Sequence, residues 1–221
     1  MFAKDKFGKV GGGVVYLLQS KQISMKKVLF LILASFAFTF SYAQEKISTY
    51  HSSYFDKEYE ILAAFDNQKL NLYIEVAGEY ESEYVLFGVE GKDEIQKFSS
   101  ALETVKQKYV EWSSVAKQNG VKSFDKNFDV EFPNIIIAWR GVDWRFDFYN
   151  NLRPRFVVTD SGQCVAVMTG KATASDNQYI DQKYYFALSS VSDFDELIAK
   201  IQIDKLLSHF NQKSNIDTLF Q

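Results

Sequence analysis

The chain has 221 residues, of which 47% are hydrophobic, and a formal net charge of −3. Residues 1–43 contain six lysines and one aspartate, so residues 44–221 carry 19 basic and 27 acidic side chains, a net charge of about −8. This sign excludes the basic surface that proteins need to bind a nucleic-acid backbone, and it disfavours attachment to anionic lipid.

The stretch Met25–Ala43 predicts a secretory signal peptide. Lys26 and Lys27 precede thirteen uncharged residues, 28–40, which are followed by Ser41-Tyr42-Ala43. This is the order of a basic region, an apolar region and a cleavage site flanked by small residues. Thirteen residues rise about 20 Å as a helix, less than the roughly 30 Å of a hydrocarbon core. We therefore predict cleavage before Gln44 and export to the periplasm or beyond, with a retained membrane anchor as the alternative.

The signal divides the chain into three parts. Residues 1–24 precede Met25 and are interpreted as an over-extended N-terminus, 25–43 as the signal peptide, and 44–221 as a single exported α+β domain. We expect no stable membrane insertion of this domain after cleavage. Cys164 is the only cysteine, so no disulfide can form within the chain, and its apolar neighbours predict a small buried side chain.

The exported part begins with signals for antiparallel strands. In the stretch 69–76, Leu70, Leu72, Ile74 and Val76 alternate with other residues, which predicts a strand with one buried and one wet face. Four strands are predicted here, at residues 46–55, 58–65, 69–76 and 84–89.

A long amphipathic helix follows. Apolar residues recur at alternating spacings of three and four from Ile95 to Ala116. Asp93 and Gln96 have the spacing of a capping box, and Asn119-Gly120 is a helix stop signal. Packing of this stripe on a sheet is the preferred interpretation, and a partner-binding helix is the alternative.

The second part of the domain returns to strands and then ends in helices. Asp160-Ser161-Gly162 predicts a tight hairpin, Asp193 the start of a helix, and 204–210 a further helical turn or two. The predicted strands are residues 124–132, 135–140, 144–149, 155–160, 163–170 and 184–188.

These elements predict an α+β fold, a largely antiparallel sheet with two main helices packed on one face. The strand-to-helix junctions at 87–102 and 186–201 resemble each other at an offset of 99 residues. One interpretation is a pair of repeated β-meander-plus-helix halves, 44–120 and 121–221, that share one continuous sheet. The alternative is a chance similarity between two strand–helix units.

The residues that carry chemistry are few. His51 and His209 are the only histidines, no cysteine pair accompanies them, and no Gly-x-Ser-x-Gly elbow occurs. We therefore predict no metal site, no cofactor and no catalytic residues. Asp143 and Asp147, which flank Trp144, leave a carboxylate pair for glycan hydrolysis open.

One cluster is unusual. All four arginines and two of the three tryptophans fall within residues 139–155. A turn at Gly141-Val142 would place Trp139 and Arg140 on opposite faces of their strand, and Trp144 opposite Arg145. Arginine binds carboxylates and phosphates bidentately and stacks on aromatic rings. The predicted binding face is Trp139, Arg140, Trp144, Arg145, Tyr149, Arg153 and Arg155. The alternative places both tryptophans in the core and pairs the arginines with Asp143 and Asp147.

The sequence favours a non-enzymatic function. We expect an exported, soluble binding or accessory module of the bacterial cell envelope, with an unknown protein, a glycan or an anionic small molecule as its ligand. Two alternatives stay open: a hydrolase of envelope polymers or glycans that uses a carboxylate pair, and a structural subunit of an envelope assembly.

Overall fold

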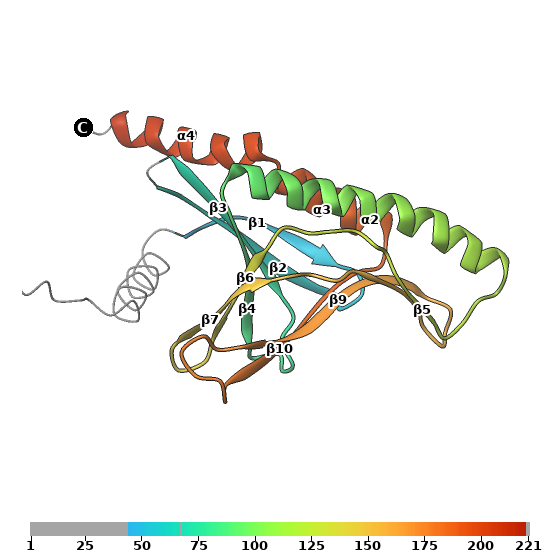
Figure 1. Ribbon diagram of the computed structural model, residues 1–221. Coiled ribbons are helices and arrows are strands. Elements are labelled where there is room, and N and C mark those ends of the chain that lie inside the picture. Colours follow the sequence, from blue (N-terminus) through green and yellow to red (C-terminus); the bar gives the residue numbers. More distant parts are fainter. Residues whose placement is uncertain (1–43, 67, 220–221) are drawn as a thin grey trace, which may run out of the picture. The chain divides into compact units, whose positions relative to one another are not determined.

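The computed structural model describes residues 44–66 and 68–219. The predicted N-terminal extension (1–24) and the predicted signal peptide (25–43) lie outside the described residues. The described residues belong to one compact unit. They form an α+β fold of two antiparallel sheets and three helices, which confirms the expected fold class (Figure 1).

The larger sheet has six strands in the order β1-β2-β3-β4-β6-β7. Leu70, Leu72, Ile74 and Val76 of β3 are at most 1% exposed, which confirms the predicted buried face. On the other face Tyr73 is 4% and Glu75 is 8% exposed, contrary to the expected wet side, whereas Lys69 at the start of the strand is exposed. The strands are β1 (Glu45–Ser52), β2 (Lys57–Asp66), β3 (Lys69–Val76), β4 (Tyr84–Glu90), β6 (Ile135–Arg140) and β7 (Trp144–Asn150).

The smaller sheet has four strands in the order β10-β9-β8-β5. Its first strand ends earlier than predicted, at Asn127 and not at 132, because Asp129 has a φ of 51° that breaks the extended backbone. Gly162, with a φ of 87°, closes the predicted hairpin between β8 and β9. The strands are β5 (Phe124–Asn127), β8 (Arg155–Val158), β9 (Cys164–Thr173) and β10 (Asp181–Leu188).

The expected single continuous sheet is thus two sheets, joined at a few points. Ala77, just after β3, exchanges two backbone hydrogen bonds of 2.8 and 3.1 Å with Tyr185 of β10. Ser175 donates from its backbone N–H to the carbonyl of Phe146 in β7 at 2.8 Å. The division into halves 44–120 and 121–221 stays a prediction, and β6 and β7, although they follow residue 120, belong to the larger sheet.

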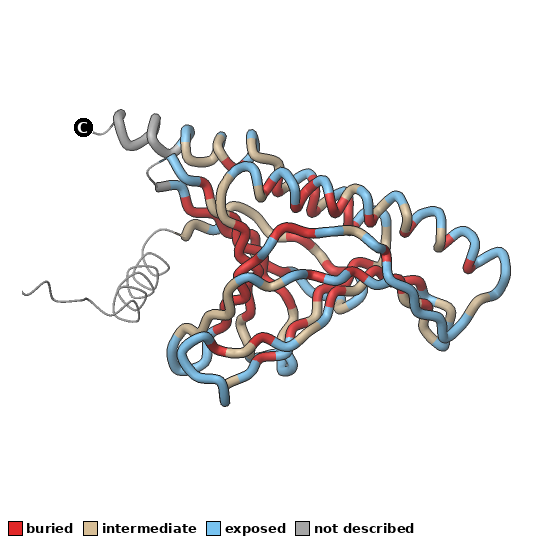
Figure 2. Tube along the Cα trace, viewed as in Figure 1, coloured by how far each residue is buried: buried red, intermediate tan, exposed pale blue. Residues whose placement is uncertain are grey.

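Three helices, α2 (Lys92–Gln118), α3 (Val191–Lys200) and α4 (Ile203–Leu219), lie on the same side of the sheets (Figure 1). The side of α2 that faces the sheets is buried and its outer side is exposed, as the tube in Figure 2 shows. Ile95, Phe98, Leu102 and Val105 are 0% exposed, which confirms the predicted apolar stripe as a core element. α4 continues well beyond the predicted residues 204–210, since no glycine or proline occurs within it.

The helix starts differ from the predicted ones. The N-cap of α2 is Gly91, whose φ of 90° favours glycine, and no side chain caps this end. The Asp93–Gln96 capping box therefore does not form, although Asp93 still lies in the first turn, where a negative charge favours the helix dipole. α3 begins at Val191, capped by the Ser190 hydroxyl, which accepts a hydrogen bond from the Asp193 N–H at 3.1 Å.

Helix α2 is fastened to the smaller sheet by one hydroxyl. The Tyr109 side chain is 5% exposed, and its O–H group lies 3.1 Å from the carbonyl oxygen of Cys164 and 2.5 Å from that of Ser189. Cys164 is buried with a free thiol, which confirms a fold without a disulfide. Among the described helices, none is both long and apolar enough to cross a membrane.

Candidate functional site

The structure separates the four arginines. Arg140 ends β6 and is exposed, whereas Arg145 of β7 forms an ion pair with Asp176. Arg155 belongs to the other sheet, on β8, and its Nε donates to Asp125 of β5 at 3.0 Å. Arg153 lies in the connection between β7 and β8 and lines an open polar groove of about 620 Å³. The paired arginines thus use acids other than the predicted Asp143 and Asp147.

The two tryptophans occupy different faces of the larger sheet. Trp139 is 4% exposed and is part of the core, where it lies directly opposite Arg145 across the β6–β7 hairpin. Trp144 lies opposite Arg140, on the other face, and is half-buried. Its ring stacks on Phe146 with centroids 6.4 Å apart, and Phe146 stacks in turn on Phe148 at 6.0 Å. The alternation predicted for each strand of the hairpin is therefore present up to Phe148.

Tyr149 departs from that alternation. The pairing register between β6 and β7 shifts between Ile135 and Ile137, so β7 carries an extra residue at this point. Tyr149 has a φ of 65°, rare for a residue other than glycine, and its side chain is 83% exposed. The bulge holds the phenol ring in solvent at the end of β7 remote from the hairpin turn.

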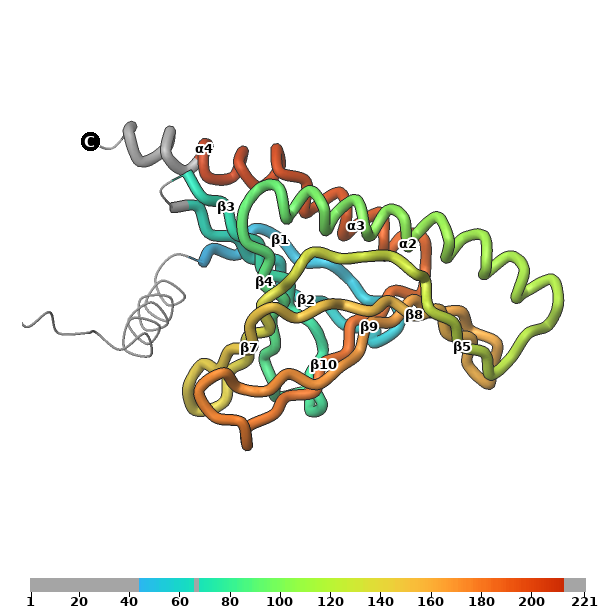
Figure 3. The backbone as a smooth tube through the Cα atoms, in the orientation of Figure 1, coloured from blue at the N-terminus to red at the C-terminus, as the bar shows by residue number. Residues whose placement is uncertain are grey.

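Three loops gather at the opposite end of β7. Tyr84, at the start of β4, pairs with Arg140, so the loop 77–83 and the turn 141–143 are neighbours. Lys183 of β10 contacts Glu79 of the first loop at 2.6 Å. The Arg145–Asp176 ion pair attaches the third loop, 174–180, to β7. Figure 3 shows the three loops at the same end of the molecule, away from the helices.

These loops present large apolar side chains to solvent. Tyr80 is 66% exposed, Val142 is 100% exposed and Tyr179 is 85% exposed. Loops on a rigid scaffold are the usual carriers of binding residues, because the scaffold fixes their positions while their sequence is free to vary. We call this set of residues the hairpin-tip surface: Tyr80, Glu81, Arg140, Val142, Asp143 and Tyr179.

A chain of polar contacts on the outer face of the larger sheet approaches this surface. Lys46 donates to one oxygen of Glu60 at 2.7 Å, and the Tyr84 hydroxyl donates to the other at 3.0 Å. The hydrogen bond from Lys46 lowers the pKa of Glu60, whereas burial raises the pKa of Tyr84. Glu75 is 8% exposed and accepts from the Glu60 N–H at 2.8 Å, and burial raises the pKa of its carboxyl. This carboxylate completes the backbone hydrogen bonding where β2 and β3 separate.

The two carboxylates of the predicted pair have different surroundings. Asp143 is exposed in the hairpin turn. Asp147 lies in β7, and one of its oxygens accepts from the Thr173 N–H at 2.9 Å. Neither residue lines the groove that contains Arg153. Within the described ranges, no three histidine, cysteine or acidic side chains are placed to hold a metal ion.

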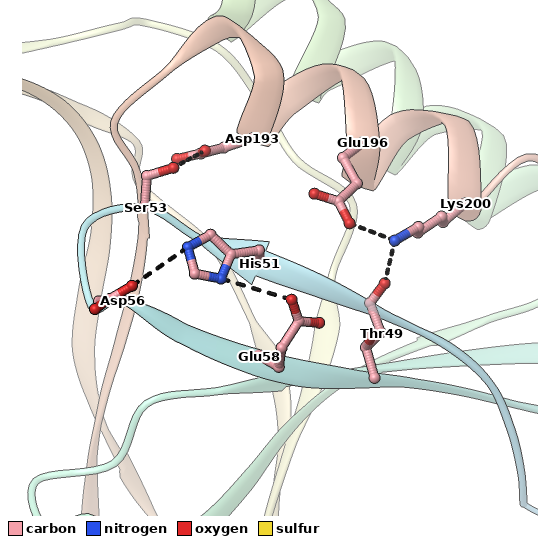
Figure 4. A network of polar contacts seen from close by, with 8 residues as sticks. All are labelled: Thr49, His51, Ser53, Asp56, Glu58, Asp193, Glu196 and Lys200. Carbon is pink, nitrogen blue, oxygen red and sulfur yellow. Dashed lines mark hydrogen bonds and ion pairs between the residues drawn. The ribbon is translucent and has the colours of Figure 1, made fainter.

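The polar network around His51 fastens elements together. The ring nitrogens of His51 lie 3.7 Å from Asp56 and 3.6 Å from Glu58, in and after the β1–β2 turn (Figure 4). Ser53 of the same turn donates to Asp193 of α3 at 2.5 Å, and no contact joins Ser53 to His51 in the described part of the chain. A serine whose hydroxyl is held by another carboxylate is not activated by the histidine. The contacts of His51 stay within the β1–β2 hairpin, and the hydrogen bond from Ser53 to Asp193 attaches the turn to α3.

An apolar pocket, which the sequence analysis did not identify, lies between the end of α2 and the smaller sheet. Its volume is about 230 Å³, and Trp112, Val115 and Phe124 are among its lining residues. The Lys126 ammonium lies 4.3 Å from the centre of the Trp112 ring. Trp112 stacks on Phe128 at 5.1 Å, so this residue of the predicted stripe serves both the core and the pocket wall.

The exposed tyrosines of the hairpin-tip surface were also missed. Tyr80 and Tyr179 lie about a hundred residues apart, and neither belongs to the arginine–tryptophan window. The signal in the sequence was an isolated tyrosine among small and acidic residues in each predicted loop. No family model, no curated protein and no solved structure matches the chain.

Proposed function

We propose that the protein is an exported binding module that engages a partner through the hairpin-tip surface. One observation carries the proposal: three loops from distant parts of the chain are fastened side by side and expose Tyr80, Val142 and Tyr179. Holding such side chains in water without a partner stabilises nothing in the monomer. Tyrosine is enriched in binding surfaces, since it offers a large contact area at a small loss of conformational entropy.

The proposal keeps part of the predicted binding face and leaves part out. Arg140 is within the hairpin-tip surface, and Trp144 and Arg145 support it from β7. Trp139 acts as a core residue. Arg153 and Arg155 lie on other elements, and Tyr149 lies at the far end of β7, about 23 Å from the turn at 3.3 Å per residue.

Photo-crosslinking in living cells tests this function. The photoreactive amino acid p-benzoylphenylalanine replaces Tyr80 or Tyr179 in the full chain, and Tyr149 serves as the matched control because its 83% exposure lies between their values of 66% and 85%. We expect adducts of the same mass from both tip positions and none from position 149. No adduct from either tip position, or the same adduct from all three, contradicts the proposal.

Export is the second part of the proposal and rests on the sequence of residues 25–43. Cell fractionation followed by N-terminal sequencing tests it in a Gram-negative host. We expect a mature protein outside the cytoplasm that begins at Gln44. An uncleaved chain in the cytoplasm, or one held in the membrane fraction, contradicts this part.

A further inference from the structure

The electrostatic balance of the hairpin-tip surface indicates what kind of partner fits it. The sequence suggested that clustered arginines attract an anionic ligand. In the structure most cations near the tip are already neutralised by acids of the loops themselves. The pairs are Arg145 with Asp176, Lys183 with Glu79, and Lys171 with Asp181.

The charges left over are mainly negative. Glu81 and Asp143 are exposed, and neither side chain forms an ion pair or hydrogen bond within the described residues. Within the part of the chain that the structure describes, Glu83 accepts only from neutral groups, the Gln182 side chain at 2.7 Å and the Tyr80 N–H at 3.0 Å. Among the six residues of the hairpin-tip surface, Arg140 is the one cation, against the carboxylates of Glu81 and Asp143 and that of the neighbouring Glu83.

We infer that the hairpin-tip surface binds a protein segment rich in lysine or arginine, a conclusion that rests on the proposed function. Carboxylates flanking exposed tyrosine rings offer such a segment two complementary interactions. Glu81 and Asp143 supply charge-assisted hydrogen bonds, and the rings of Tyr80 and Tyr179 supply cation–π contacts. The whole of residues 44–221, with a net charge of about −8, attracts a basic partner at long range and repels anionic glycans and lipids.

The surface also has the composition of a recognition site for protein. Its three loops contain tyrosine, serine, asparagine and glycine between the charges, as in the sequences 78–82 and 175–179. Serine and asparagine adapt their hydrogen bonds to a partner backbone, and tyrosine supplies rigid contact area. A small-molecule site would need a concave pocket, whereas these residues project from the scaffold.

A library of random 12-residue peptides displayed on phage provides the probe. Phage that bind the protein are selected from this library, with protein purified from cells that express the full chain as the bait. Selected peptides are then synthesised and titrated against the wild type and its variants. We expect an excess of lysine and arginine in these peptides, and a Kd that rises about tenfold or more between 50 and 500 mM salt.

Variants of the tip locate the binding. The double change Glu81→Gln with Asp143→Asn should raise the Kd of the peptides about five- to tenfold. The double change Tyr80→Ala with Tyr179→Ala should raise it at least tenfold. Glu111→Gln, on the exposed side of α2, and Tyr149→Asn are the matched controls and should leave the Kd unchanged. Asparagine is chosen at 149 because it tolerates a positive φ. Circular dichroism checks that each variant is folded.

The outcomes separate the two proposals. Peptides that depend on Tyr80 and Tyr179 but carry no excess of basic residues overturn the inferred partner class and leave the proposed function standing. If no tip variant weakens the binding of the selected peptides, both the inferred partner class and the proposed function are overturned. Binding of phosphatidylglycerol vesicles more tightly than of any selected peptide also overturns the basic-segment inference.

Discussion

Removing the Tyr109 hydroxyl should destabilise the protein at neutral pH and have a smaller effect at alkaline pH. In Tyr109→Phe, the carbonyls of Cys164 and Ser189 lose the donor that joins them to α2. Leaving buried acceptors without a donor costs about 1–3 kcal/mol. For a domain of this size, each kcal/mol lowers the melting temperature by about 2–4 °C, so we expect a fall of roughly 2–12 °C at pH 7.

The sign of the pH dependence follows from burial. Burial raises the pKa of Tyr109 from 10.0 to about 12. A group whose pKa is raised in the folded state contributes stability that is complete below pH 10 and is lost as the pH rises to 12. At pH 11 the wild type has therefore lost up to about 1.4 kcal/mol of unfolding free energy through ionisation of Tyr109. The phenylalanine variant has no group to ionise at this position and does not lose it. The stability difference between the two proteins should shrink by that amount.

Urea unfolding at pH 7, 9, 10 and 11, followed by far-UV circular dichroism, measures this difference. Tyr59→Phe is the matched control, since burial also raises the pKa of Tyr59 to about 12 but its hydroxyl makes no hydrogen bond in the described part of the chain. It should match the wild type at pH 7 and exceed its stability at pH 11. Stability profiles that run parallel from pH 7 to 11 for Tyr109→Phe and the wild type would refute the reasoning.

Three further predictions concern the core, the α3 cap and the surface. Leu102→Ala, in the fully buried stripe of α2, should destabilise by about 3–5 kcal/mol in urea, whereas Val115→Ala, at a site 52% exposed, should change stability by less than about 1 kcal/mol. Equal effects would contradict the packing of α2. Asp193→Ala should cost about 2–4 kcal/mol, because its 2% exposed carboxylate accepts from the Ser189 N–H and from two serine hydroxyls. A thermal melt unchanged from the wild type would show that these bonds do not hold the cap. Arg155→Ala should cost less than about 1 kcal/mol, since its ion pair with Asp125 is exposed, and high salt should abolish the difference.

The sequence was sufficient to predict features that depend on one helix or strand alone. The stripe from Ile95 to Ala116 predicts both the helix and its buried side, because the period of a helix is a local property. The alternation in β3 predicts its core face for the same reason. The prediction of the α2 cap was wrong. The N-cap is Gly91, which starts the helix through its positive φ and without a side chain, so a rule based on capping side chains cannot detect it.

Pairing between distant strands could not be derived in this way. Arg153 and Arg155 are adjacent to the β6–β7 hairpin in sequence, yet the chain passes to the other sheet at β8. The hairpin-tip surface depends on contacts such as Glu79 with Lys183, whose residues are 104 positions apart. No periodicity in the sequence records such a contact, so Tyr80 and Tyr179 could be recognised as neighbours of Arg140 only in the folded chain.

The path of the chain between the two sheets has a consequence for when the hairpin-tip surface is assembled. The chain contributes β5 to the smaller sheet, then β6 and β7 to the larger one, and then returns for β8 to β10. A chain that stops after α2 leaves β4 as an open edge, with unpaired backbone groups that invite aggregation. The loop 77–83 is fixed in place only when β10, one hundred residues later, has docked beside it. The proposed binding through the hairpin-tip surface therefore requires the complete fold, and a chain that lacks β10 should not bind the proposed partner.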